Sequence, residues 1–428
     1  MRKVRKDPLE KLRTNKLLTH VVFLVATFVL FSGAASALKA FAGTDLWALV
    51  GSVFPETITP EMLKDKYEKQ TIRVVVVPGH DNQYVGTVFK GRTEAEHTRK
   101  IARHLMKYLE NDERFTAIVV RDTDTGKYTD TFSNYFTQKE NEIKSFMKER
   151  RSHVKVLKNE GIIKSTEIID HNYATSNTAI RLYGVNKWSN ENSIDLILHM
   201  HFNDYPRRTR SNEGKYSGFA LYVPDSQYSN GRASRDVAEV MQKELAQFLP
   251  ESDLPKEKGG IIEAQELIAL GSNASQRSAA LLIEYGYIYE AQFVNADTRE
   301  IMFEELALQT YNALKNYFDK EYNQTSYVTD TTLLPYTFKV TLKKGMQGSR
   351  DVLSLQAALH AEGLYPPDGK SLNDCPINGN FGPCVAAAVS MFQEKYKETI
   401  LTPLNINKAS GIVGGRTRAQ LNILYGVE

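Results

Sequence analysis

The chain has little of several features that identify common classes of protein. Only two of its 428 residues are cysteines, Cys375 and Cys384, so a cysteine-rich metal site is excluded and any zinc must be held by histidine and carboxylate. The formal net charge is only +3, and no stripe of Arg and Lys interleaved with aromatic residues runs along the chain, so nothing indicates a nucleic-acid partner. Tandem repeats, low-complexity tracts and a Gly-x-Ser-x-Gly motif are also absent.

The N-terminus has the composition of an export signal. Seven Arg and Lys residues within the first 16 positions precede residues 17–38, which carry no formal charge. Such a stretch is long enough to cross a bilayer with its basic flank in the cytoplasm. Small residues at 35–37 and 40–42 resemble processing sites, so a retained signal anchor and a cleaved signal peptide both stay open. In either case we expect the rest of the chain to be exported, into a compartment where a disulfide persists.

From Thr71 onward, short apolar runs alternate with segments of helical period, which predicts an α/β fold. The expected strands lie at 74–77, 117–120, 195–200, 218–223 and 279–284, and the expected helices at 94–109, 233–248 and 299–318. We expect these divisions: a basic tail and signal or transmembrane helix (1–42), a connector (43–70), an α/β domain (71–320) with a polar surface insertion at about 125–180, a linker (321–339), and a small helical domain (340–428).

Glu94 opens one of the expected helices, at the edge of its apolar face. An unpaired carboxylate directed towards a core is costly, and a bound metal would remove that cost. Alternatively, Glu94 only stabilises the helix N-terminus, as acids in a first turn often do. The helix alone leaves both interpretations open. His97 and His104, on a neighbouring face of the same helix, are interpreted as core-edge residues.

The run 195–203 places two histidines on one face of a strand, because His199 and His201 are two residues apart. His80, His201 and Glu284 all lie at or just past the carboxyl ends of apolar strands. Open α/β sheets bind their ligands at that edge. Together with Glu94, these groups indicate a metallohydrolase.

Region 71–320 resembles the zinc-dependent N-acetylmuramoyl-L-alanine amidases of bacterial cell walls. The resemblance rests on motifs that occur in the family's order: Pro78-Gly79-His80, Glu94 before Ile101-Ala102, Arg121-Asp122-Thr123-Asp124, Arg181 with Asn186, His199-Met200-His201-Phe202-Asn203, and Glu284-Tyr285-Gly286-Tyr287. This sequence departs from the family pattern where His199 replaces a serine and Tyr287 replaces a phenylalanine. The first departure leaves the choice between His199 and His201 as a ligand open.

The resemblance implies a mixed sheet flanked by helices, and zinc (Zn2+) held by His80, Glu94 and His201. It implies Glu284 as the catalytic acid/base. The expected partner is peptidoglycan, cut at the amide between the muramic lactyl group and L-alanine. The protein would then face the cell wall, anchored in the membrane through its N-terminal helix, or be secreted or periplasmic if that helix is cleaved.

The C-terminal region resembles the small three-helix peptidoglycan-binding domain that is often attached to wall hydrolases. The matching motifs are Val352–Gln356, Gly379–Gly382 before Ala388–Gln393, and Gly411–Thr417. Cys375 and Cys384 flank the Gly-x-Phe-Gly turn, and we expect a local disulfide there, with two free buried thiols as the alternative.

Other interpretations remain open at this point. An inactive hydrolase domain would make the protein an exported wall-binding scaffold. The number of ligands also allows a zinc peptidase that cuts another amide of peptidoglycan. The insertion at 125–180 is either an inhibitory segment over the substrate groove, a partner-docking surface, or only a solvated face.

Overall fold

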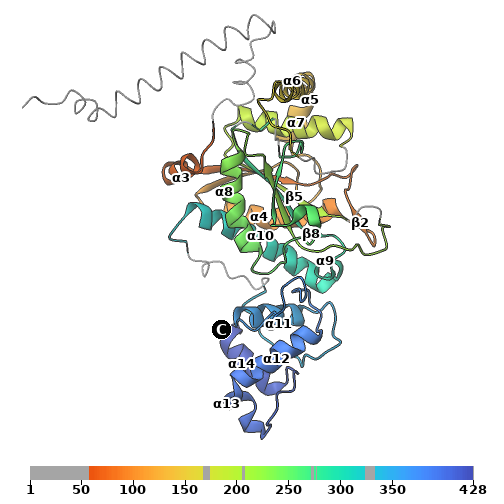
Figure 1. Ribbon diagram of the computed structural model, residues 1–428, viewed down its shortest axis with the longest axis vertical. Coiled ribbons are helices and arrows are strands. Elements are labelled where there is room, and N and C mark those ends of the chain that lie inside the picture. Colours follow the sequence, from red (N-terminus) through yellow and green to blue (C-terminus); the bar gives the residue numbers. More distant parts are fainter. Residues whose placement is uncertain are drawn as a thin grey trace, which may run out of the picture. The chain divides into compact units, whose positions relative to one another are not determined.

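The computed structural model describes residues 57–166, 174–204, 208–270, 274–275, 277–322 and 333–427 (Figure 1). The expected signal or transmembrane helix at 17–38 lies outside these residues. Within the part of the chain that is described, no helix is both long enough and apolar enough to cross a membrane.

A six-stranded sheet forms the centre of the fold, in the order β4-β1-β5-β8-β6-β7. Strands β4, β1, β5 and β8 are parallel, whereas β6 pairs antiparallel to β8, so the sheet is mixed as expected. A separate two-stranded ribbon pairs β2 with β3. The strands are β1 (Ile72–Pro78), β2 (Val88–Phe89), β3 (Arg92–Thr93), β4 (Phe115–Val119), β5 (Leu196–Asn203), β6 (Ala220–Pro224), β7 (Ile261–Ala264) and β8 (Ala279–Tyr287).

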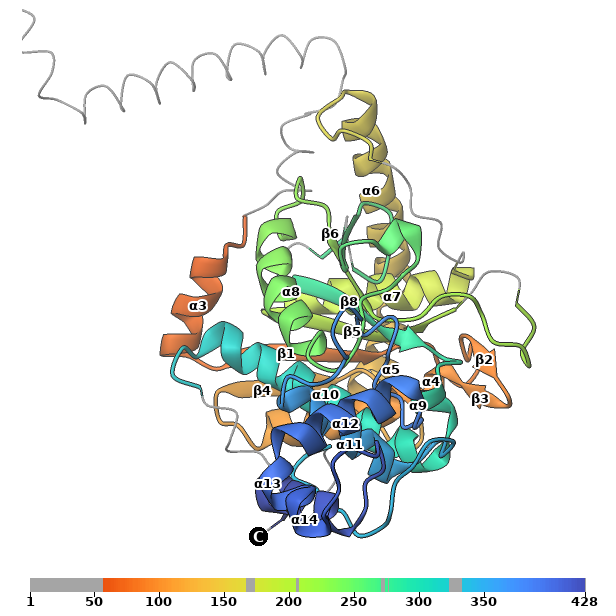
Figure 2. The ribbon, with the colours of Figure 1, turned by 60° about the horizontal axis from the view of Figure 1, so that its bottom comes forward.

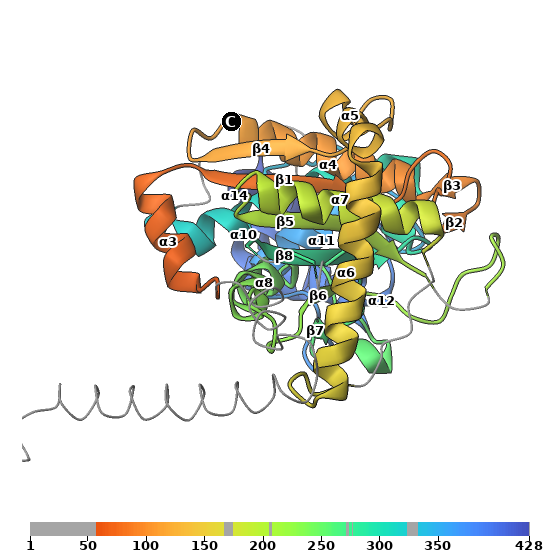
Figure 3. The ribbon, with the colours of Figure 1, turned by 90° about the horizontal axis from the view of Figure 1, so that it is seen from above.

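Helices cover both faces of the sheet, because the central strands are apolar on both sides. One face packs against α4 (Glu94–Glu110), α8 (Gly231–Leu245) and α10 (Ala296–Phe318), and α8 and α10 also contact each other (Figure 2). The other face packs against α5 (Asp130–Gln138) and α7 (Ser176–Glu191). The long helix α6 (Glu140–Asn159) lies against α7 (Figure 3). The shorter helices are α3 (Pro60–Lys69), the 3-10 turn η2 (Pro255–Glu257) and α9 (Ala291–Val294).

The five expected strands and three expected helices are present, and among the further elements β7 and α7 bear on the sheet. Strand β7 has only four residues with half of them partly exposed, too short a pattern to separate from a loop. Helix α7 begins at Ser176, inside the range expected for the insertion, and packs directly on the sheet.

Residues 333–427 contain α11 (Arg350–Ala361), α12 (Pro383–Lys395), α13 (Lys397–Ile400), the 3-10 turn η4 (Thr402–Leu404) and α14 (Gly415–Tyr425). The expected apolar helix positions are all buried: Val352, Leu355, Leu359, Ala388 and Phe392. Cys375 and Cys384 form a disulfide. The boundary at residue 340 stays a prediction.

Candidate metal and catalytic site

Strand β1 ends at Pro78, and the chain then turns sharply through Gly79 and His80. The φ angle of His80 is 63°, in the left-handed region that residues other than glycine rarely occupy. Thr98 Oγ1 donates a hydrogen bond to the Gly79 carbonyl at 2.9 Å, and Arg121 Nη2 donates to the same oxygen at 2.7 Å. Arg121 is itself buried. Two side chains therefore hold the backbone that presents His80 at the carboxyl end of β1.

The Glu94 side chain points into the site and not back to its own helix N-terminus. Thr93 caps that helix by accepting from the Glu96 amide. Glu94 Oε2 lies 3.0 Å from His80 Nε2, and Oε1 lies 2.9 Å from His201 Nδ1. Two backbone amides complete the shell around the carboxylate. Thr87 N–H donates to Oε2 and Phe202 N–H donates to Oε1, both at 3.0 Å.

His201 comes from β5, where it is in register with Glu284 of β8. Register partners on parallel strands face the same side of a sheet, so these two side chains share one face. The Gly79 turn packs closely against His201, since a Cβ on Gly79 would lie 2.6 Å from the imidazole Cε1. Glycine at this position lets His80 and His201 approach each other.

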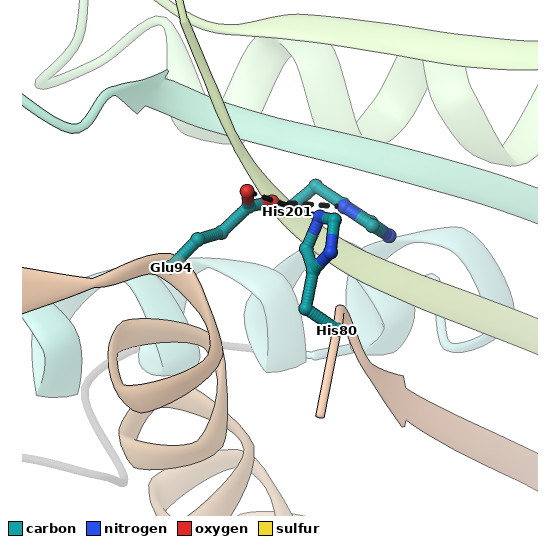
Figure 4. A group of neighbouring side chains, drawn as sticks. All are labelled: His80, Glu94 and His201. Carbon is teal, nitrogen blue, oxygen red and sulfur yellow. Dashed lines mark hydrogen bonds and ion pairs between the residues drawn. The ribbon is translucent and has the colours of Figure 1, made fainter. Parts of the chain in front are cut away.

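His80, Glu94 and His201 form one group, with a possible ligand atom from each within 4.8 Å of the others (Figure 4). Their side chains come from the end of β1, the start of α4 and β5. The His80 side chain is 32% exposed, against 4% for Glu94 and 16% for His201. The group is thus buried on the Glu94 side and opens to solvent at His80.

This donor set fits zinc. Two imidazoles and one carboxylate are a known ligand set of catalytic zinc, which keeps its fourth position for water or substrate. The backbone donors that orient Glu94 are the kind of outer support that fixes a metal ligand. The backbone at Gly86 packs closely against His80, because a Cβ on Gly86 would lie 2.6 Å from the His80 ring carbon Cδ2.

The two histidines and the carboxylate shift one another's proton affinities. Burial favours protonation of Glu94, but His80 and His201 outweigh that effect and hold the pKa of the carboxyl well below its usual range. Burial alone would lower the pKa of His80, yet the Glu94 carboxylate raises it. Burial dominates at His201 and lowers its pKa despite the contact with Glu94.

Glu284 is a second, partly buried acid beside this group, in register with His201. Among the described residues, its Oε2 atom has no hydrogen-bond partner. Burial, followed by the charges of Glu94 and Glu257, raises the pKa of Glu284 well above its ordinary value. A carboxyl oxygen without a partner among the described residues, next to a potential ligand, is placed to accept and return a proton.

Glu257 is a buried carboxylate that the sequence did not point to. Its Oε1 accepts from Asn203 Nδ2 at 2.7 Å and from the Tyr222 hydroxyl at 2.6 Å. Its Oε2 accepts from the hydroxyl of Tyr287 at 3.4 Å. Tyr287, which stands where the family has phenylalanine, therefore has a polar partner for its hydroxyl. Glu257 lies in a 3-10 turn without periodicity, so no pattern signalled its burial.

Three further histidines of the described residues, His199, His97 and His104, lie outside the three-residue group. His199 is buried on β5, two residues before His201. Neither of its ring nitrogens has a hydrogen-bond partner in the described part of the chain. Burial, with a smaller effect of His201, lowers the pKa of His199 to about 3. His97 is also fully buried and packs against the ring of Phe202 at 5.2 Å, so it is a core residue and not a core-edge one. His104 lies 4.0 Å from a carboxylate oxygen of Glu304.

The two arginine motifs have different surroundings. Arg121 supports the His80 turn, as described above. The Arg181 guanidinium carbon lies 4.7 Å from the ring centroid of Tyr128, whose hydroxyl donates to Asp81 at 3.3 Å. Asn186 is buried and donates from α7 to the Ile268 carbonyl at 3.1 Å.

Much of the expected insertion forms helices α5 and α6. Helix α6 contacts α7 and α5, and Ile143, Val154 and Leu157 are buried residues of α6. Lys158 forms an ion pair with Glu266. The inhibitory and docking roles of this segment stay predictions.

Residues 74–316 match a family model described as N-acetylmuramoyl-L-alanine amidase. A comparison with curated proteins finds no match. The solved structures that resemble the chain include an N-acetylmuramoyl-L-alanine amidase from Clostridium difficile 630, at 17% identity and TM-score 0.36, which covers 59% of this chain and 100% of that one. The CwlD amidase from Clostridioides difficile, in complex with the GerS lipoprotein, has 17% identity and TM-score 0.37 over the same shares. The amidase Ami1 from Mycobacterium smegmatis has 12% identity and TM-score 0.38, over 59% of this chain and 99% of that one.

Proposed function

The chain belongs to the N-acetylmuramoyl-L-alanine amidase family, whose model matches more than half of it, and from this premise we propose that it is a zinc-dependent hydrolase of peptidoglycan. The bond cut is the amide between N-acetylmuramic acid and L-alanine. The observation that carries the proposal is the convergence of His80, Glu94 and His201 from three separate elements.

His80, Glu94 and His201 would hold the metal. Zinc in such a site supplies Lewis acidity, which polarises a carbonyl and makes water more acidic. Backbone groups of the chain hold two of these ligands in place. The Thr87 and Phe202 amides fix the Glu94 carboxylate, and the backbone turn at Gly79 sets the His80 ring.

Glu284 is the proposed acid/base. Its Oε2 accepts the proton of the attacking water and then donates it to the nitrogen of the cleaved amide, because an amine cannot leave as an anion. The register between His201 and Glu284 supports this role, since it places the carboxyl beside a ligand on the same sheet face. No serine or cysteine nucleophile is required.

We propose that the protein works outside the cytoplasm, on the cell wall. Residues 17–38 would anchor it in the membrane or be removed as a signal peptide. The helices from α11 to α14 would bind peptidoglycan and keep the hydrolase on its substrate. The Cys375–Cys384 disulfide supports an oxidising compartment.

Metal removal tests the proposal. The purified chain should hydrolyse peptidoglycan, lose this activity after dialysis against a chelator, and recover it when one equivalent of zinc is added. Glu284→Gln should bind zinc and remain inactive. Activity that persists without metal would contradict the zinc dependence. A zinc-loaded wild type that binds peptidoglycan without cleaving it would instead indicate a wall-binding scaffold.

A further inference from the structure

Arg208 is a buried arginine beside the site, with its side chain only 3% exposed. Its Nη2 donates to Thr87 Oγ1 at 3.0 Å and to the Val88 carbonyl at 2.9 Å. Its Nε donates to Asp204 Oδ1. Its Nη1 donates to the Thr209 carbonyl at 2.9 Å. All three guanidinium nitrogens are therefore used within the protein.

The same guanidinium contacts two aromatic rings. Its central carbon lies 5.4 Å from the ring centroid of Phe89 and 5.2 Å from that of Tyr289. Cation–π contacts of this kind strengthen when they are shielded from water. Arg208 thus touches β2, the chain after β5 and the chain after β8.

Each of these three segments carries a residue of the site. The first leads into α4, and its Thr87 exchanges hydrogen bonds with Glu94: Thr87 N–H donates to Oε2 at 3.0 Å, and Glu94 N–H donates to the Thr87 carbonyl at 2.9 Å. Asp204 follows His201 by three residues, and Tyr289 follows Glu284 by five.

Arg208, Thr87 and Asp204 form a closed hydrogen-bond network, in which each side chain contacts the other two. Thr87 Oγ1 accepts from Arg208 and donates to Asp204 Oδ2, while Asp204 Oδ1 accepts from Arg208. A planar guanidinium fits this geometry because its donors are fixed in one plane, whereas a lysine ammonium offers a single centre of charge. A buried charge is tolerated only with such partners, so the arrangement depends on arginine.

We propose that Arg208 is a positioning residue that holds together the segments carrying Glu94, His201 and Glu284, and so sets the affinity and geometry of the metal site. The inference rests on the zinc-binding part of the proposed function. It does not depend on which bond is cut.

The test compares the full-length wild type with Arg208→Met, Arg208→Lys and the matched control Arg210→Met. The control removes the same charge two residues away, from an exposed position. Zinc affinity is measured by competition with a chromophoric chelator. The visible absorption of the cobalt-substituted protein reports the ligand geometry. Arg208→Met should weaken zinc binding about 10–100-fold, the usual effect of losing an outer support, and alter the cobalt spectrum. Arg208→Lys should recover only part of the loss, and Arg210→Met should match the wild type.

Zinc binding within twofold of the wild type in Arg208→Met, with an unchanged cobalt spectrum, would overturn the proposal. If Arg208→Met does not fold, Thr87→Val provides the test, because it removes the Thr87 hydroxyl that bonds to Arg208 and Asp204 and keeps the arginine. That variant should bind zinc more weakly than the wild type, and equal affinity would refute the inference. Because these titrations need no peptidoglycan, they separate failure of this inference from failure of the proposed hydrolysis.

Discussion

Replacing Gly79 by alanine should disable the metal site although the substitution replaces none of the proposed ligands. An added Cβ would lie 2.6 Å from the His201 Cε1 atom and 2.6 Å from the Met200 carbonyl oxygen. The carbonyl cannot retreat easily, because it accepts the Gly79 amide at 2.7 Å and belongs to a central strand. The strain must therefore fall mainly on the His201 ring.

The size of the effect follows from these distances. Ordinary contact begins at 3.4 Å, so the imidazole must move by about 0.8 Å. Metal–ligand distances tolerate deviations of only about 0.2 Å. We expect zinc affinity to fall about 10–100-fold. Overpacking of this kind should also lower the free energy of unfolding by about 1–3 kcal/mol.

Zinc affinity and unfolding of the metal-free protein are measured separately for Gly79→Ala and for Gly415→Ala. Gly415 is a suitable control, since a Cβ there meets nothing within 4 Å. The control should bind zinc as the wild type does and be equally stable or slightly more stable. A folded Gly79→Ala protein with wild-type zinc affinity would refute the reasoning about the approach of the two histidines.

Three further predictions concern single side chains. Glu284→Gln should keep its zinc content and lose about 10²–10⁴-fold in peptidoglycan hydrolysis, and a smaller loss would argue against its acid/base role. Glu94→Gln should lower the free energy of unfolding of the metal-free protein by about 1–3 kcal/mol in urea titrations, because the new amide faces backbone N–H donors, and an unchanged midpoint would contradict this. Burial lowers the pKa of His97 to about 3. As the pH falls from about 6.5 towards 3, the unfolded chain therefore binds a proton at this residue and the folded chain does not. The folded state loses stability over that pH range. His97→Leu should therefore reduce the stability lost between pH 7 and pH 5 by about 2 kcal/mol, and an unchanged loss would show that His97 does not titrate as described.

The sequence predicted the site where it depends on the ends of regular strands. A run of valines ending in Pro78-Gly79 fixed the place of His80, and period two placed His201 on a polar face. The strand register that brings Glu284 beside His201 follows from parallel pairing. Helical periodicity placed Glu94 at the edge of a core, but only the structure shows that its carboxylate faces His80 and His201 and does not cap its own helix.

The support around the site could not be predicted in the same way. Glu257 and Arg208 lie in segments without periodicity, and each is buried because distant segments supply its partners. Such contacts arise from the tertiary fold and leave no local pattern. Strand β7 escaped detection for a related reason, because its partner strand at the sheet edge defines it more than its own four residues do.

Product identification tests the central claim most directly. Peptidoglycan is digested with zinc-loaded wild type, with Glu284→Gln as the control, and the fragments are identified by mass spectrometry. The account predicts free peptides that begin with L-alanine and glycan strands whose muramic acid carries a free lactyl carboxyl group, both missing from the control. Fragments cut at another amide, or the same fragments from Glu284→Gln, would contradict it.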